Sequence, residues 1–341
     1  MSKSARLKPI PVHMRSRPDC SVQYLTFDGS TYVIKLSRCH LRGKNIYTSL
    51  RHSNVTVECV YGGPCLVDQN GRVTGLDIRG KSVPVATVCG IRLYDKFSDM
   101  NCKAKCISLN AVITTYNPKV VSVAEAARRY GDEIVNSEFT SDVLRLLARM
   151  HNTYEFVHWD LHHHNQLIDL RDHTPRFLDF DYATMRYYEK SPILRSFCVE
   201  GFLSLLDSIH RGIGGESVPL DTDSRTLGYA YDRIMVLVSH HAFYRRSGRV
   251  YLPTNYPEQS IQKHHNMART LVNKIGWRAH IVDTVGMTAL DGPLKGHFKI
   301  LFIAVLVIVM ERYQYTPEQI EQYFREEKNH TTAGSGGRIT S

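Results

Sequence analysis

The spacing of apolar residues changes about one third of the way along this chain. Between residues 21 and 94 they fall in short β-branched runs such as SVQYLTF and TYVIKLSR, and LNAVITTYNP at residues 109–118 is a further strand candidate. Later they recur three and four positions apart, as in NSEFTSDVLRLLARMH, a pattern typical of amphipathic helices. Strands followed by helices indicate an α+β fold. We therefore predict two lobes, a β-rich N-lobe and a mainly helical C-lobe.

The predicted domain organisation has four parts. Residues 1–18 are basic and contain three prolines, so we expect a flexible arm. Residues 19–117 form the expected β-rich N-lobe, and residues 118–329 the helical C-lobe. Residues 330–341, which are rich in glycine, serine and threonine, predict a disordered tail.

Four short stretches predict local structure. Asp28-Gly29-Ser30 between two β-rich runs predicts a hairpin turn. Thr316-Pro317-Glu318-Gln319 predicts a helix start, with an N-cap threonine and a glutamine three residues later. YGGP at residues 61–64 predicts a plain turn rather than a phosphate loop. ILFIAVLVIVM at residues 300–310 has 11 apolar residues, whereas a membrane span needs about 20, so we expect a buried helix.

Composition limits the partners and the compartment. A net charge of +10 permits an acidic partner, but the chain has no run of like charges long enough for a nucleic-acid arm, so nucleic acid is not expected. Eight cysteines without a CxxC pair favour reduced thiols. The N-terminus lacks the apolar stretch of a secretory signal, so the cytoplasm or the nucleus is expected. The oligomeric state stays open.

The stretch FVHWDLHHHNQLID at residues 156–169 carries the most informative polar side chains. Three of its histidines are consecutive and cannot all face one ion from regular structure, which disfavours a histidine-bound transition metal. Asp160 and Asn165 lie among and after the histidines, and Asp179 follows 14 residues later in FLDFD. Transfer of a phosphoryl group needs one carboxylate for the attacking hydroxyl and oxygen ligands for Mg²⁺. These three residues supply such groups.

His158-Trp159-Asp160 with Asn165, followed by Asp-Phe-Asp, resembles the catalytic loop and metal-binding hairpin of the protein-kinase-like superfamily. The resemblance covers residues 137–182. It implies ATP and Mg²⁺ as cofactors, Asp160 as the catalytic base, and Asn165 and Asp179 as metal ligands. It further implies that His158 braces the loop, and that Asp181 is an additional polar group near the metal.

Several positions depart from typical protein kinases. Trp159 replaces the usual arginine, and His162 stands where serine/threonine kinases have lysine. Asp-Phe-Asp replaces Asp-Phe-Gly. The histidine and the second aspartate are similar to the aminoglycoside and choline phosphotransferase branch.

The N-lobe contributes one candidate for nucleotide binding. Lys35 in TYVIKLSR resembles the lysine of the Val-Ala-Ile-Lys strand, which contacts the α- and β-phosphates of ATP. Lys81 and Lys96 are alternatives. No Gly-x-Gly-x-x-Gly precedes Lys35, and FDGS is the one candidate cover for phosphates. No glutamate lies between Lys35 and Glu58, where the usual partner of the lysine is expected.

The sequence thus favours an ATP- and Mg²⁺-dependent kinase that transfers the γ-phosphate to a hydroxyl. The acceptor is a protein serine or threonine, to which the size of the protein kinase branch leans, or a small molecule. The alternative from another class is a catalytically inactive pseudokinase that serves as a binding module.

Overall fold

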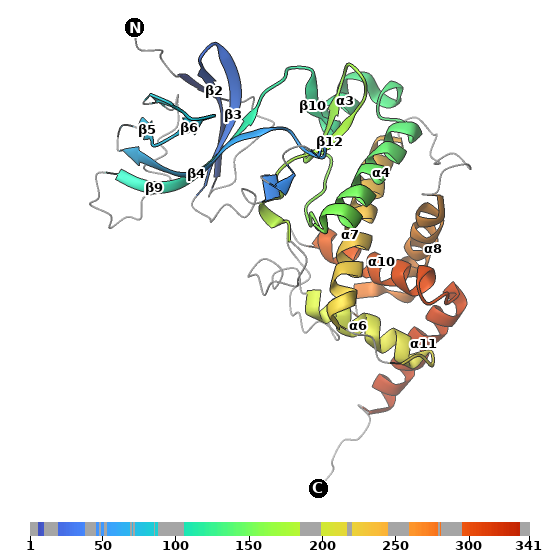
Figure 1. Ribbon diagram of the computed structural model, residues 1–341. Coiled ribbons are helices and arrows are strands. Elements are labelled where there is room, and N and C mark those ends of the chain that lie inside the picture. Colours follow the sequence, from blue (N-terminus) through green and yellow to red (C-terminus); the bar gives the residue numbers. More distant parts are fainter. Residues whose placement is uncertain are drawn as a thin grey trace. The chain divides into compact units, whose positions relative to one another are not determined.

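A computed structural model gives the structure of the protein (Figure 1). It describes residues 6–9, 20–37, 46–47, 49–50, 53–68, 70, 72–84, 86–87, 106–184, 199–216, 220–244, 259–278, 280 and 295–334. The chain divides into two compact units. Unit 1 comprises Met1–Ser122 and Asn165–Ala183, and unit 2 comprises Val123–His164 and Thr184–Ser341.

The larger sheet of unit 1 is a closed barrel with the strand order β1-β2-β3-β9-β4-β5-β8. Its strands are β1 (Arg6–Pro9), β2 (Cys20–Phe27), β3 (Ser30–Ser37), β4 (Cys59–Asp68), β5 (Arg72–Thr74), β8 (Ala86–Thr87) and β9 (Cys106–Thr115). Neighbouring strands are antiparallel except β1 and β8, which pair in parallel and close the barrel. Strands β6 (Asp77–Ile78) and β7 (Lys81–Ser82) form a separate hairpin.

Strand β3 shows how the barrel positions a charged side chain. Tyr32, Ile34 and Leu36 alternate along the strand and are buried in the core of the barrel. Because successive side chains of a strand point to opposite faces, Lys35 lies on the outer face between Ile34 and Leu36. The alternation that buries the core therefore also presents Lys35 outside it.

A second sheet of unit 1 contains the hairpin that follows the histidine-rich stretch. Its strands are β10 (Val120–Ser122), β11 (Gln166–Asp169) and β12 (Pro175–Phe177), which pair antiparallel in that order. On the far edge of β12, the Phe177 N–H donates to the Val55 carbonyl (2.7 Å), and the Thr56 hydroxyl donates to the Phe177 carbonyl (2.8 Å). Both edges of the hairpin are thus paired, which fixes where Asp179 leaves β12.

The helices of unit 2 include one that is buried along most of its length. They are α3 (Val123–Tyr130), α4 (Ser137–Tyr154), α6 (Val199–Gly212), α7 (Leu220–Tyr244), α8 (Gln259–Ile275), α10 (Lys295–Glu311) and α11 (Pro317–Gly334). Every residue of α10 from 301 to 310 is buried, and α6, α7 and α8 contact this helix (Figure 1). A helix that is apolar on all sides needs such cover. No helix within the described ranges has the length and apolar composition that a membrane crossing requires.

Several local predictions are confirmed. Asp28 and Gly29 form the β2–β3 turn, with φ angles of 52° and 77°. At the start of α11, the Gln319 N–H donates to the Thr316 hydroxyl (3.3 Å), and the Thr316 N–H donates to the Gln319 side chain (2.8 Å). This reciprocal pair is the capping box that the sequence predicts. The α+β class is confirmed too, with its β-rich first part and helical second part.

Three predictions need correction. Arg6–Pro9, within the segment expected to be a flexible arm, forms β1, because backbone pairing with β2 orders these residues. Helix α11 continues to Gly334, so residues 330–334 are not part of a disordered tail. The YGGP stretch at residues 61–64 lies inside β4, where pairing with β9 keeps it extended despite its two glycines and proline.

Candidate functional site

Lys35 and Asp179 meet in an ion-pair cluster within unit 1. The Lys35 Nζ lies 2.5 Å from Asp179 Oδ1 and 2.6 Å from Asp181 Oδ2, although 144 and 146 residues separate them in sequence. The three side chains keep 17%, 30% and 34% of their surface exposed. The cluster therefore combines a cation and two carboxylates that solvent or a ligand can reach.

Tyr47 holds the backbone of Asp179. Asp179 has a left-handed conformation with φ of 63°, which costs a non-glycine residue about 1–2 kcal/mol. Its N–H donates to the Tyr47 hydroxyl (3.1 Å), and the Phe180 ring packs edge-on against the Tyr47 ring (5.2 Å between centroids). Burial, and then the charge of Asp179, raises the pKa of Tyr47, so this hydroxyl stays protonated. Tyr47 was not predicted from the sequence, because the segment around it carries no motif.

Asn165 lies at the same end of the β11–β12 hairpin as Asp179. It immediately precedes β11, and its carbonyl accepts the N–H of Leu178 (2.9 Å), the residue before Asp179. Amide and carboxylate oxygens are hard ligands of the kind that Mg²⁺ prefers. No three His, Cys, Asp or Glu side chains in the described part of the chain are grouped to hold a metal ion. Mg²⁺ is usually completed by waters and substrate phosphates, so the pair Asn165 and Asp179 fits such an ion.

In unit 2, Asp232 of α7 holds the loop that contains Asp160. One carboxylate oxygen accepts the His158 N–H (2.7 Å), and the other accepts the Trp159 N–H (2.9 Å). Gly228, one turn earlier on the same face of α7, lies so close to the loop that a Cβ there would be 2.7 Å from Val157. The glycine thus permits the close approach that Asp232 needs to reach both amides.

Trp159 itself is strained and doubly anchored. Its φ of 62° is left-handed, which is rare for a bulky residue and costs about 1–3 kcal/mol. Besides the backbone bond to Asp232, its indole Nε1 donates to the Thr184 hydroxyl (2.9 Å), and the ring is buried. These contacts fix the direction of the chain at Asp160, the next residue, whose side chain is 5% exposed.

His151 of α4 completes the anchor. Its Nε2 lies 3.1 Å from Asp232 Oδ2, and its ring stacks on Tyr229 (4.1 Å between centroids). Burial lowers the pKa of His151, while the hydrogen bond to Asp232 opposes that shift. Asp232 was not predicted from the sequence, although an acid beside one arginine in the mainly apolar stretch YAYDRIMVLV is a usable signal of a buried partner.

His162 faces Asp160 in a defined tautomer. The His164 N–H donates to His162 Nδ1 (3.2 Å), and an N–H donates only to an unprotonated nitrogen. The proton of the neutral ring is therefore on Nε2, which lies 3.8 Å from Asp160 Oδ1. Burial lowers the pKa of His163, and the electrostatic effect of the neighbouring His164 lowers it further.

Lys81 and Glu58 have ion-pair partners other than Lys35. Lys81 is largely exposed on β7 and pairs with Asp28 (3.0 Å). Lys96 lies outside the described residues. Glu58 pairs with Arg79 (2.6 Å).

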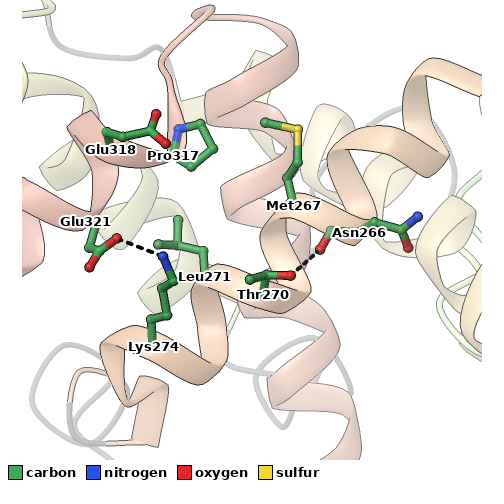
Figure 2. Close-up of a pocket in the computed structure, with 8 residues that line it drawn as sticks. All are labelled: Asn266, Met267, Thr270, Leu271, Lys274, Pro317, Glu318 and Glu321. Atoms are coloured by element: carbon green, nitrogen blue, oxygen red, sulfur yellow. Dashed lines mark hydrogen bonds and ion pairs between the residues drawn. The ribbon is translucent and has the colours of Figure 1, made fainter.

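A pocket of about 350 Å³ lies between α8 and the start of α11 (Figure 2). Its lining residues are Asn266, Met267, Thr270, Leu271, Lys274, Pro317, Glu318 and Glu321. Figure 2 shows Lys274 reaching Glu321 (3.5 Å) across the pocket. None of the residues predicted for the site lines it. We assign this pocket no part in the chemistry.

Comparisons with known proteins give little sequence similarity. No protein-family model and no curated protein matches the chain. Among solved structures, the Cydia pomonella granulovirus kinase PK-1 is 10% identical, with a TM-score of 0.33. The match covers 64% of each chain, so this chain spans less than two thirds of the viral kinase. WaaP, solved in complex with acyl carrier protein, is 11% identical over 84% of this chain and 90% of its own, with a TM-score of 0.35.

The order of the elements agrees with the resemblance that the sequence shows. A curled antiparallel sheet comes first, then helix α4, a tight loop, the β11–β12 hairpin and further helices. The structure thus shows an α+β fold with strands first and helices after them.

Proposed function

We propose that the chain is a phosphotransferase that moves the γ-phosphate of ATP to a hydroxyl group in the presence of Mg²⁺. The observation that carries the proposal is the contact between Lys35 of β3 and Asp179 after β12 (2.5 Å). A lysine for the phosphates and an aspartate for the metal must lie together in such an enzyme. Here they do so within one compact unit.

Lys35 would contact the α- and β-phosphates, and Asn165 and Asp179 would hold Mg²⁺ through their side-chain oxygens. When bound, the metal would neutralise negative charge on the phosphates. Tyr47 contributes by holding the left-handed backbone of Asp179.

Asp160 would orient the attacking hydroxyl and accept its proton. Asp232 keeps the preceding residues in place through two buried N–H bonds, and the His162 Nε2–H faces the Asp160 carboxylate. A carboxylate held in this way is ready to orient the hydroxyl without rearrangement. Positioning of this kind, together with electrostatic stabilisation, is the main source of catalysis in phosphoryl transfer.

The proposal has two versions, which differ in the molecule that accepts the phosphoryl group. The size of the protein kinase branch favours a protein serine or threonine. His162 and the second aspartate of Asp-Phe-Asp favour a small molecule, because both are similar to the aminoglycoside and choline phosphotransferase branch. A screen with γ-labelled ATP against protein and metabolite acceptors separates them, since label moves to one class only.

Turnover of Mg-ATP tests the proposal itself. Asp179→Asn keeps the size of the side chain but removes its charge, so we expect ATP hydrolysis or autophosphorylation to fall at least 100-fold. Asp172→Asn is the matched control, because Asp172 is exposed at the other end of the same hairpin and caps the Thr174 N–H. Equal background turnover in all three proteins would leave the binding-module alternative.

A further inference from the structure

The ammonium of Lys35 is shared between two carboxylates. Asp179 and Asp181 flank Phe180, and each places one oxygen within 2.6 Å of the Lys35 Nζ. Phe180 is fully buried, and its ring packs against Tyr47. The buried ring thus anchors a turn that presents both carboxylates to the same cation.

Exposure argues against a structural role for the second carboxylate. The Asp181 side chain retains 34% of its surface, and ion pairs with that much solvent access contribute at most about 1 kcal/mol to stability. Removal of the Asp181 charge is therefore compatible with folding, which makes its effect on ligands measurable.

Both carboxylates of this cluster lie against the same ammonium. Free nucleotide polyphosphate brings several more negative charges and must displace a carboxylate to reach Lys35. A divalent cation bound to the nucleotide compensates both effects, because it neutralises phosphate charge and offers the displaced carboxylate a partner. An Asp-Phe-Gly sequence would lack this extra carboxylate.

We propose that Asp181 determines selectivity for metal-bound over free nucleotide, by occupying Lys35 until a cation accompanies the phosphates. This inference rests on the proposed function, since it assumes that Lys35 contacts phosphates. It assigns a role to a residue that the sequence resemblance leaves undefined.

Calorimetric titration of Asp181→Asn tests the inference. Wild type and variant are titrated with ATP in EDTA and with ATP in excess Mg²⁺. We expect free ATP to bind the variant about tenfold more tightly than wild type, whereas Mg-ATP affinity changes less than threefold. Asp172→Asn is the control, because it makes the same charge change at an exposed aspartate at the other end of the β11–β12 hairpin. Unchanged or weaker binding of free ATP to Asp181→Asn overturns the inference.

A measurement without nucleotide separates this inference from the proposed function. Loss of one carboxylate partner should make Lys35 react at least twofold faster with an acylating reagent. Peptide mass spectrometry measures the rate of this modification. An equal rate in wild type and Asp181→Asn would show that Asp181 does not occupy Lys35. If Lys35 becomes more reactive but neither protein binds Mg-ATP, the proposed function fails and the selectivity role fails with it.

Discussion

Asp232 and Asp179 occupy contrasting environments in the two units. Asp232 is fully buried, and its oxygens accept two backbone N–H groups and lie against His151. Asp179 is about one third exposed and faces the Lys35 ammonium. A buried carboxylate that satisfies backbone donors cannot leave them without a large cost, whereas a partly exposed one can exchange its partner for a ligand. The comparison separates an aspartate that builds the loop from one that is available for binding.

Asp232→Ala should have the largest effect on stability. It leaves the N–H groups of His158 and Trp159 without their buried acceptor, so we expect the free energy of unfolding to fall by about 3–5 kcal/mol. Urea denaturation measures this. Asp179→Ala should change it by less than about 1 kcal/mol. Similar losses in the two variants would remove the distinction between the two aspartates.

Acidification should lower the stability of the folded protein through the buried histidines of unit 2. Burial lowers the pKa of His240 and of His265 to about 3, below the 6.5 of an exposed histidine. The unfolded chain then binds more protons than the folded one below pH 6.5, so stability falls as pH falls. Between pH 7 and pH 5 each histidine should contribute a loss of about 2 kcal/mol.

Urea denaturation at both pH values measures that slope. His240→Gln should flatten it, because glutamine cannot gain the proton. An unchanged slope in this variant would show that the burial of His240 does not control the pH response.

Tyr47→Phe should have a smaller effect. It removes the acceptor of the Asp179 N–H, and we expect a loss of about 1 kcal/mol in unfolding free energy, with weaker Mg-ATP binding. The comparison variant is Tyr32→Phe, since the Tyr32 hydroxyl has no hydrogen bond with the described residues. If both variants bind Mg-ATP as wild type does, Tyr47 has no part in placing Asp179.

Lys35→Met should have the smallest effect on stability and a clear effect on binding. The ion pairs of Lys35 are partly exposed, so the unfolding free energy should change by less than about 1 kcal/mol. Mg-ATP affinity should fall at least tenfold, because the phosphates lose their cation. Lys81→Met should leave the Mg-ATP affinity unchanged. If Lys81→Met lowered the affinity and Lys35→Met did not, Lys81 would be the lysine that contacts the phosphates.

Local patterns predicted the parts of the fold that depend on near neighbours. The alternation in TYVIKLSR places Lys35 opposite the core, and TPEQ predicts the start of α11, because both depend on residues a few positions apart. The prediction of a turn at YGGP was wrong, because pairing with β9 overrode the local preference of glycine and proline for turns. A short segment of sequence does not indicate which distant strand it will pair with.

The contacts that define the candidate site join residues far apart in the chain. Asp232 bonds His158 across 74 residues, and Tyr47 bonds Asp179 across 132. One sequence holds no signal that pairs such positions. The resemblance marked Asp160, Asn165 and Asp179, whereas the residues that hold their backbones in place emerged only with the structure.

The most direct test of the proposed phosphotransferase compares wild type with Asp160→Asn. Affinity for Mg-ATP and the rate of γ-phosphate release or transfer are measured side by side for both proteins. We predict that the affinities agree within about threefold and that the rate falls about 10²–10⁴-fold, the usual contribution of a positioned general base. Equal rates in the two proteins would contradict the assignment of Asp160 and the phosphotransferase account that depends on it.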